Sequence, residues 1–207
     1  MRTILGPDFF DRKTLVVSKE LIGKYLVRMM PDPSTKLGVK PVGFMITETE
    51  GYFGFNDQAS KARHGKTPGN LPMYAEAGTI YVYFTYGMHW MLNIVTEKEE
   101  FPAAVLIRGV EFSPAVRKKG VRLGLAARSA PFFRTAGLHL NGPAKLTKFL
   151  KIDKKLNTKK LGRASGLWVE DRGVKINPRH IKRAPRVGIA YAGSYAKKPW
   201  RFVYVQK

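Results

Sequence analysis

The feature that most constrains this chain is a concentration of aromatic side chains in residues 81–91, which hold five tyrosine, phenylalanine or tryptophan residues and one histidine. Strand alternation places Tyr81 and Tyr83 on one face and Phe84 on the other. Tyr86 stands next to a glycine where such a segment would turn back, so the pattern predicts a β-hairpin with a bulky aromatic at its tip. An exposed aromatic ring needs a partner to stack on or wedge into, and nucleic acid bases offer one.

The distribution of charge points to the same kind of partner. The chain of 207 residues has a net charge of +22. Residues 101–207 hold 25 lysine and arginine residues against 4 aspartate and glutamate residues, whereas residues 1–100 hold 12 against 11. A positive field of this size attracts polyanions, and each cation that neutralises a phosphate adds to the salt dependence of binding. Solubility alone does not require one sign of charge, so we favour a nucleic acid partner over a merely basic surface.

Length and composition exclude several other classes of protein. The chain is long enough to bury a proper core, and we expect a single domain over residues 1–207. It contains no cysteine, which excludes disulfides, thiolate metal sites and a cysteine nucleophile. The four histidines are scattered, so we expect no metal ion and no cofactor. Because no apolar run could span a bilayer or form a signal-peptide core, we expect a soluble intracellular protein with no membrane contact.

Hydrophobic periodicity and turn residues predict an α+β fold. We expect a mixed, mostly antiparallel, curved sheet with a protruding β-hairpin and flanking helices. Thr14 and Asn141 are the expected caps of the two helices. A loop as long as 51–72 is more often functional than idle, and 117–134 is basic and less regular. The expected helices are residues 14–23 and 141–150, and the expected strands beside the hairpin are 25–30, 42–50, 104–110, 167–170, 186–191 and 200–205.

Two carboxylates end the second of these strands, beside the long loop. Glu48 and Glu50 alternate with threonines, so their side chains share one face. A desolvated carboxylate at such a place suits a general base that activates water, and burial would adjust its pKa. Arg108 is the single charged residue in the apolar strand 104–110, and a buried arginine needs a carboxylate such as Glu50 beside it. The plainer alternatives are a solvated strand end and an arginine at the surface.

Short motifs follow one another along almost the whole chain, beginning at Phe9-Phe10. In order, the others are Glu48-Thr49-Glu50-Gly51-Tyr52, Gly65-Lys66-Thr67-Pro68-Gly69-Asn70, Tyr81-Val82-Tyr83-Phe84-Thr85-Tyr86-Gly87-Met88, Asn93, Leu106-Ile107-Arg108, Asn141-Gly142-Pro143-Ala144-Lys145-Leu146 and Arg186-Val187-Gly188. Any one of these motifs alone is a weak signal, but the ordered set is specific. In this order the motifs resemble the alkyladenine (3-methyladenine) DNA glycosylase family.

The resemblance implies a monofunctional base-excision enzyme. Such an enzyme flips an alkylated or deaminated purine, of the 3-methyladenine, hypoxanthine or ethenoadenine class, out of duplex DNA and hydrolyses its N-glycosidic bond, leaving an abasic site. Glu50 matches the general base that deprotonates a water, while Arg108 and the main-chain carbonyl of Val187 match the groups that hold that water. Glu48 is then structural. Attack by a base-activated water predicts inversion at C1′.

The resemblance also implies which residues form the base pocket. Tyr52 and Tyr83 match the aromatic walls that sandwich the flipped base. Asn93 matches the pocket amide that obstructs the exocyclic amino group of normal guanine. The other aromatic residues of the hairpin are expected to form hydrophobic core, namely Tyr81, Phe84 and Trp90.

The implied contacts with duplex DNA lie in two further motifs. Tyr86 matches the residue that is wedged into the minor groove, where a side chain inserted in the stack offsets the loss of the flipped base. Met88 and His89 lie beside it. Lys145, at the start of the second expected helix, is a candidate for gripping a phosphate.

One position departs from the family pattern. The family usually has a histidine after the serine that corresponds to Ser60, and this histidine hydrogen-bonds to the flipped base, whereas here Lys61 follows. Three interpretations stay open: Lys61 donates in its place, a shifted loop brings in His64, or neither residue reaches the base. A protonated Lys61 would disfavour a cationic base such as 7-methylguanine and favour a neutral acceptor such as the O6 of hypoxanthine.

Other functions remain open on the same residues. A desolvated Lys61 could form a Schiff base with the sugar, which leaves a bifunctional lyase as a minor alternative. A family member that binds damaged DNA with lost or narrowed catalysis is another, and a non-catalytic nucleic-acid-binding protein is a third. In the leading interpretation, a monomer acts on double-stranded DNA containing a damaged purine, in the cytoplasm on the nucleoid of a bacterium or in the nucleus of a eukaryote.

Overall fold

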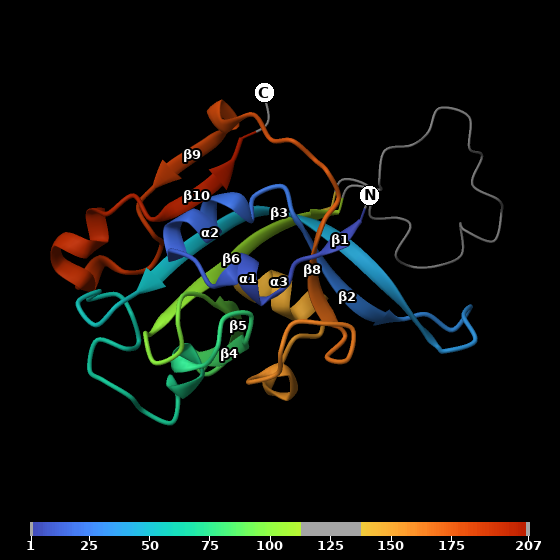
Figure 1. Ribbon diagram of the computed structural model, residues 1–207, viewed down its shortest axis with the longest axis horizontal. Helices are drawn as coiled ribbons and strands as arrows, with labels where there is room; N and C mark the ends of the chain where they lie inside the picture. The colour runs from blue at the N-terminus through green and yellow to red at the C-terminus, as the bar shows by residue number, and fades with distance from the viewer. Residues whose placement is uncertain (1, 113–137, 206–207) are drawn as a thin grey trace.

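The longest strand organises the sheet. The computed structural model describes residues 2–112 and 138–205, and in it β3 runs over Val39–Phe53. The first half of β3 pairs with β2 (Tyr25–Pro31). Its second half pairs with β6 (Ala103–Phe112) on one side and with β10 (Arg201–Tyr204) on the other (Figure 1). Because three strands meet β3, its second half is enclosed on both edges.

The remaining strands extend this sheet on both sides. Strand order across the main sheet is β1-β8-β2-β3-β6-β5-β4, and every pairing among the described residues is antiparallel. The bounds are β1 (Thr3–Ile4), β4 (Ile80–Thr85), β5 (His89–Val95), β7 (Leu138–Asn141), β8 (Leu167–Asp171) and β9 (Ile181–Ala184). β7 joins β6, and β9 joins β10. The predicted α+β class with a curved, mostly antiparallel sheet is therefore confirmed.

Short helices pack against the strands and share one core with them. They are α1 (Pro7–Phe10), α2 (Thr14–Glu20) and α3 (Pro143–Phe149), with 3-10 turns at Leu71–Tyr74, Lys154–Leu156, Pro178–His180 and Ala190–Lys197. Val17 of α2 and Leu146 of α3 are fully buried in the same hydrophobic cluster as Ile46 and Ile107. Burial of such side chains removes apolar surface from water and is the main stabilising contribution to this fold.

Three predictions about local structure are wrong. Residues 186–191 do not form a strand; the chain turns at Gly188, whose φ is +75°, and Ile189 is buried in a small separate cluster. Neither expected cap acts as one. Thr14 is the first residue of α2 and its N–H donates to Glu97 Oε1 at 3.0 Å, while Gly142, in place of Asn141, precedes α3. The basic stretch 117–134 lies outside the described residues.

The hairpin of β4 and β5 divides into a buried base and an exposed tip. Tyr81 is buried as predicted and contacts the Tyr83 ring at 5.3 Å between centroids. Phe84 was expected in the core, but it is 48% exposed and contacts half-buried Trp90 across the hairpin at 4.6 Å. The prediction for Phe84 is wrong because the outer end of β4 extends past the core. At the turn, Tyr86 is 77% exposed.

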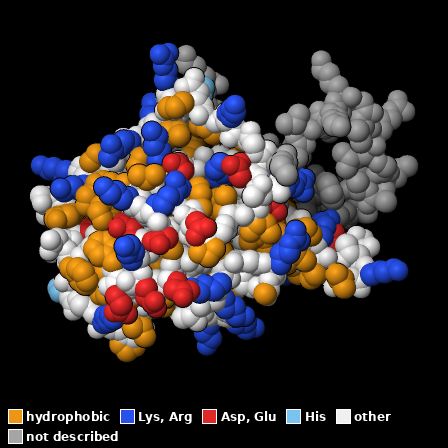
Figure 2. Space-filling view, in the orientation of Figure 1, with side chains coloured by type: hydrophobic (Ala, Val, Ile, Leu, Met, Phe, Trp, Pro, Cys, Tyr) orange, Lys and Arg blue, Asp and Glu red, His pale blue; other side chains and the backbone are white. Residues whose placement is uncertain are grey.

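Charge on the surface is dispersed on the face that Figure 2 shows. Lys and Arg side chains lie among hydrophobic ones across this face, and several Asp and Glu side chains gather near its middle. The described Lys and Arg side chains therefore do not form one continuous patch on this face. Among the described residues, none of the helices has the length and apolar character to cross a bilayer.

Candidate active site

A bulge in β3 presents two glutamates to β6. Ile46 faces Val110 and Glu48 faces Gly109, so Thr47 is an extra residue in the ladder. Such a bulge bends the strand and redirects its side chains. The neighbouring backbones are close here, because a Cβ on Gly109 would lie 3.1 Å from the Cβ of Glu48. A larger residue at this position would make a tight contact with Glu48, which a shift of a few tenths of an ångström would relieve.

Glu50 is fully buried and is held by three groups from different parts of the chain. Its side chain is 0% exposed. The hydroxyl of Tyr52 donates to Oε2 at 2.8 Å, and the main-chain N–H of Val187 donates to Oε1 at 2.8 Å. The Nε of Arg108 lies 3.5 Å from Oε1. The carboxylate is thus fixed in orientation from both of its oxygens.

Burial dominates the electrostatics of this carboxylate. Loss of hydration raises the pKa of Glu50 above its usual range, and neighbouring Glu48 raises it further. The charge of Arg108 and the hydrogen bonds from Tyr52 and Val187 oppose this rise by favouring the ionised form. A buried carboxylate with a raised pKa can accept a proton, which is the property that a general base requires.

Arg108 is oriented chiefly by Glu48. Its Nε donates to Glu48 Oε1 at 3.1 Å, while Nη1 of Arg201 on β10 donates to the same oxygen at 2.9 Å. The sequence suggested Glu50 as the partner of Arg108, and the structure places both carboxylates beside it. Glu48 therefore links β3, β6 and β10 and holds a positive charge next to Glu50.

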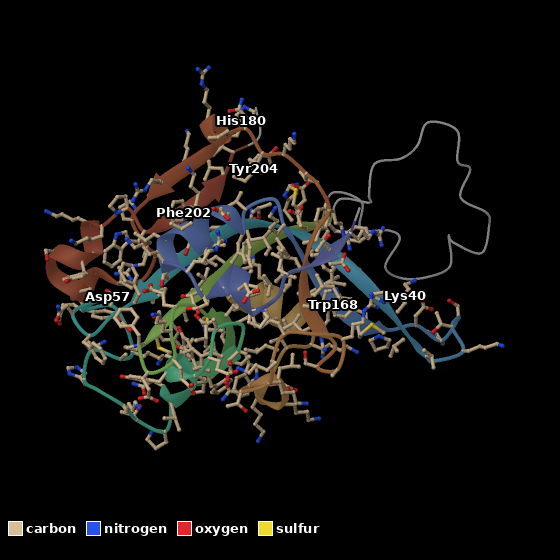
Figure 3. The ribbon with its side chains drawn as sticks, in the orientation of Figure 1. Lys40, Asp57, Trp168, His180, Phe202 and Tyr204 are labelled. Atoms are coloured by element: carbon tan, nitrogen blue, oxygen red, sulfur yellow. The ribbon has the colours of Figure 1, made fainter. Side chains whose placement is uncertain are left out.

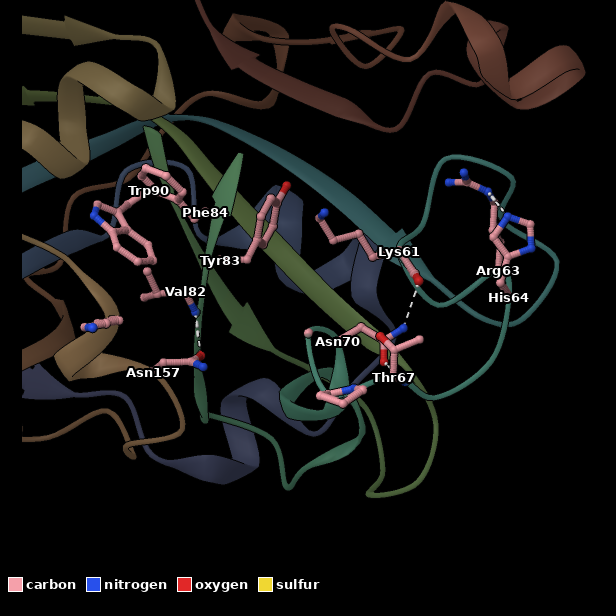
Figure 4. Close-up of a pocket in the computed structure, with 13 residues that line it drawn as sticks. Lys61, Arg63, His64, Thr67, Asn70, Val82, Tyr83, Phe84, Trp90 and Asn157 are labelled. Carbon is pink, nitrogen blue, oxygen red and sulfur yellow. Dashed lines mark hydrogen bonds between the residues drawn. The ribbon is translucent and has the colours of Figure 1, made fainter. Parts of the chain in front are cut away.

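A small cavity with aromatic walls lies beside Glu50. Its volume is about 30 Å³, room for about one water molecule, so a purine can enter only if a lining side chain moves. The Nζ of Lys61 lies 4.4 Å from the centre of the Tyr83 ring (Figure 4). Burial and the charge of Arg63 lower the pKa of Lys61. The cavity is lined by Tyr52, Ala59, Lys61, Met73, Tyr81, Tyr83, Asn93 and Ala104.

The two candidates for the missing pocket histidine lie in different places. Lys61 points toward Tyr83 and lines the cavity, whereas His64 lies farther along the loop and does not (Figure 4). His64 accepts a hydrogen bond from Arg63 Nε at 2.9 Å and borders a neighbouring open groove of about 500 Å³. Of the two residues, Lys61 is the one that faces the space between Tyr52 and Tyr83.

Asn93 lies in the cavity wall with its amide directed at the main chain. It is buried, and its Nδ2 donates to the carbonyl of Tyr81 at 3.2 Å. The amide is therefore fixed in place before any ligand enters.

The residues expected to contact DNA lie outside the cavity. Tyr86 and Met88 are exposed at the hairpin tip, and His89, the first residue of β5, is half-buried. Tyr86 has a φ of +52°, a left-handed conformation that costs a non-glycine residue about 1 kcal/mol. Lys145 is exposed in the first turn of α3. Gly87 has a φ of +64°, so both central residues of the turn that Thr85 and Met88 close are left-handed, as in type I′ hairpin turns.

Comparison with known proteins identifies the family. The model of the methylpurine-DNA glycosylase family matches residues 8–207. The chain belongs to this family. A protein of Methanocella arvoryzae called putative 3-methyladenine DNA glycosylase is 39% identical over 96% of this chain and 91% of its own length. The DNA-3-methyladenine glycosylase of Mus musculus is 34% identical over 98% of this chain and 59% of its own length, and that of Homo sapiens is 32% identical over 97% and 65%.

These findings confirm the resemblance seen in the motifs and the enzyme class that it implied. They place the chain in a family of DNA repair glycosylases. The match covers the segments that carry Glu50, the cavity and the hairpin alike.

Sequence reasoning missed one part of the site, a buried ion pair between Asp57 and Arg186. Both side chains are 0% exposed and lie next to the glutamate and its cavity. Tyr191 was missed as well; it is exposed, and the guanidinium of Arg63 lies 5.3 Å from its ring centre. The sequence carries no signal that pairs residues 129 positions apart, although Arg186 stands within one of the short motifs noted above.

Proposed function

We propose that this protein excises an alkylated or deaminated purine from double-stranded DNA with a water molecule activated by Glu50. The observation that carries the proposal is the position of Glu50, a fully buried carboxylate with a raised pKa beside an aromatic cavity. A protein that only bound DNA would be weakened by a carboxylate beside an anionic ligand. The substrate class is that of 3-methyladenine, hypoxanthine and ethenoadenine.

The proposed reaction is hydrolysis of the bond between C1′ and the purine nitrogen. Water attacks C1′ and gives its proton to Glu50, while the electron pair of the breaking bond leaves with the purine. An N-alkylated cationic purine departs neutral, whereas a neutral purine such as hypoxanthine departs as an anion that takes up a proton from solvent. The products are the free base and an abasic site. The negative charge of Glu50 also stabilises the oxocarbenium-like transition state, and Arg108 with the carbonyl of Val187 would hold the water. An N-alkylated purine already carries positive charge, so it leaves more readily than a neutral one.

Access of the base to Glu50 requires that the nucleotide leave the duplex. Tyr86 is suited to fill the resulting gap, because it is exposed and held by the turn in a left-handed conformation. Met88 and His89 would support it in the minor groove, and Lys145 would contact a phosphate. Tyr52 and Tyr83 would stack on the two faces of the flipped base, with Asn93 at its edge. One copy of the chain holds all of these residues, so we propose that a monomer acts.

Lys61 would set the preference among damaged bases. An ammonium group beside the ring of Tyr83 repels a cationic base and can donate a hydrogen bond to a neutral carbonyl. We therefore expect faster excision of hypoxanthine than of 7-methylguanine by this protein. Faster excision of 7-methylguanine would contradict this assignment, and a protein–DNA adduct trapped by borohydride would show Schiff-base chemistry that the proposal excludes.

The second candidate function is binding of damaged DNA with lost or narrowed catalysis. The observation in its favour is the cavity of about 30 Å³, in which Lys61 occupies space that a purine would need. One assay distinguishes the two functions. Duplex DNA with a single hypoxanthine or ethenoadenine is incubated with the protein, and abasic sites are then cleaved with alkali. Strand cleavage that is lost in Glu50→Gln, with binding retained, supports the enzyme, whereas binding without cleavage by the wild-type protein supports the second function.

A further inference from the structure

The buried pair of Asp57 and Arg186 lies next to the residues that donate hydrogen bonds to the proposed catalytic carboxylate, Glu50. Nη1 of Arg186 donates to Asp57 Oδ2 at 2.6 Å and Nη2 donates to Oδ1 at 2.7 Å. Figure 3 labels Asp57 where the loop after β3 meets the C-terminal segment. Two charges removed from water lose hydration that their mutual attraction only partly restores, so such a pair is weak evidence for stabilisation alone. Its presence calls for another reason.

The guanidinium of Arg186 also contacts the two residues that follow Glu50 in the chain. Nη1 donates to the carbonyl of Gly51 at 2.9 Å, and the guanidinium lies 4.5 Å from the ring centre of Tyr52. On its other side it lies 4.9 Å from the ring centre of Trp200. The arginine thus fixes the main chain next to Glu50 and the back of one cavity wall.

The main chain of Arg186 leads to the third contact. Val187 is the next residue, and its N–H donates to Glu50 Oε1. Tyr52, which stacks against the guanidinium, donates to Oε2. Arg186 therefore contacts both residues that donate hydrogen bonds to Glu50. Val187 follows it in the main chain, and the ring of Tyr52 stacks against its guanidinium. No regular strand holds the segment of Val187, because the chain turns at Gly188.

We propose that Arg186, locked by Asp57, is a positioning residue that aims both hydrogen-bond donors at Glu50. The inference rests on the proposed function of Glu50 as the base. Without the lock, the segment of Val187 and the ring of Tyr52 are free to shift, and Glu50 loses the hydrogen bonds that favour its ionised form. The pKa of the carboxyl then rises further, because burial remains while two opposing contributions weaken.

Other charged or titratable groups face Glu50 from the neighbouring strands. They are Glu48 on β3, Arg108 on β6, Tyr83 on β4 and, beyond Glu48, Arg201 on β10. Among the described residues, the side chains of Arg186 and Asp57 form no hydrogen bond with any of these groups. A change in the titration of Glu50 after removal of the pair is therefore attributable to the donors from Val187 and Tyr52.

The test uses a double variant that replaces the ion pair by two neutral amides, Asp57→Asn with Arg186→Gln, so that no unpaired charge is buried. The matched control is Glu170→Gln with Arg172→Gln, which removes a partly buried pair (2.9 Å) at the end of β8. This pair lies near Trp168, on the opposite side of the molecule from Asp57 (Figure 3). Single-turnover release of hypoxanthine from duplex DNA is measured against pH. We expect a fall of about 100-fold at neutral pH in the double variant and a higher-pH acid limb, because small displacements of catalytic groups cost about this much. The control should change less than threefold, with no shift of its acid limb.

A second readout does not depend on turnover. The ¹³C signal of the Glu50 carboxyl is assigned by its absence in Glu50→Gln, and its titration should move to higher pH in the double variant. If the double variant does not fold, Arg186→Lys takes its place and should give a smaller shift in the same direction. Unchanged titration of Glu50 in a folded variant would overturn the positioning role. Absence of excision by the wild-type protein, or excision retained by Glu50→Gln, would instead overturn the proposed function. The two failures are therefore distinguishable.

Discussion

Glu50 and Asp57 are both buried beside an arginine, but the two carboxylates are held differently. Asp57 receives two charged hydrogen bonds of 2.6 and 2.7 Å from one guanidinium. Glu50 lies 3.5 Å from the nearest nitrogen of Arg108, and its hydrogen bonds come from a phenol and a main-chain N–H. One site thus contains a carboxylate bound by both oxygens to a single guanidinium and a second carboxylate that its arginine does not bind in this way.

The difference teaches how a fold separates structural from reactive charge. A bidentate contact gives both carboxylate oxygens a charged donor and leaves little reason for the carboxylate to change its state. Glu50 has weaker partners and a raised pKa, so a proton and a water molecule can compete for its oxygens. We therefore assign a positioning role to Asp57 and the reaction with water to Glu50.

The largest difference should appear in stability. Asp57→Asn leaves the fully buried guanidinium of Arg186 without a counter-charge, and we expect the free energy of unfolding to fall by about 3–5 kcal/mol. Denaturant unfolding followed by circular dichroism measures it. A loss below about 1 kcal/mol would show that the ion pair of Asp57 and Arg186 is not essential to the fold.

The next effect is on the pH dependence of catalysis. Glu50 must be ionised to accept a proton, and its pKa lies above the ordinary value of 4.5. The rate of base release at saturating protein should therefore fall about tenfold per pH unit on an acid limb whose midpoint lies above pH 4.5. A pH profile in single-turnover assays tests this, and a rate that stays constant down to pH 4.5 would remove the distinction between the two carboxylates.

The smallest effect is the stability change in Glu50→Gln. A carboxyl with a raised pKa stabilises the folded state at low pH, and this contribution is lost as pH rises from 4.5 through the folded pKa. Glutamine has no charge to bury, and Arg108 keeps Glu48 as a partner. The variant should be at least as stable as the wild-type protein at pH 7, with the two curves converging toward pH 4. Thermal unfolding at several pH values would show a deficit at pH 7 if Glu50 were structural.

Much of the fold could be read from the sequence, because local patterns determine it. Alternation and turn residues located the hairpin, and apolar runs located β2, β6 and β8. The failure at 186–191 has a physical cause, since the chain turns at Gly188 and buries Ile189 while Val187 and Tyr191 stay exposed. Phe84 was misplaced because alternation says which side chains share a face and not how far the strand extends past the core.

The candidate site was readable only in part. Arg108 could be proposed because it is the single charge in an apolar strand, and Glu50 because it ends an apolar strand beside a long loop. The contact of Val187 with Glu50 and the pair of Asp57 and Arg186 join segments more than 120 positions apart. Nothing in one sequence measures such distances. The choice between Lys61 and His64 likewise needed the path of the loop.

The central claim is that Glu50 activates the water that breaks the glycosidic bond. Its most direct test is the single-turnover rate of hypoxanthine release by Glu50→Gln, measured at saturating protein with binding to the same duplex determined in parallel. We expect the rate to fall by about 10³-fold, within the range for loss of a general base, while the affinity for the damaged duplex is unchanged or tighter. A rate within tenfold of the wild-type value would contradict the account.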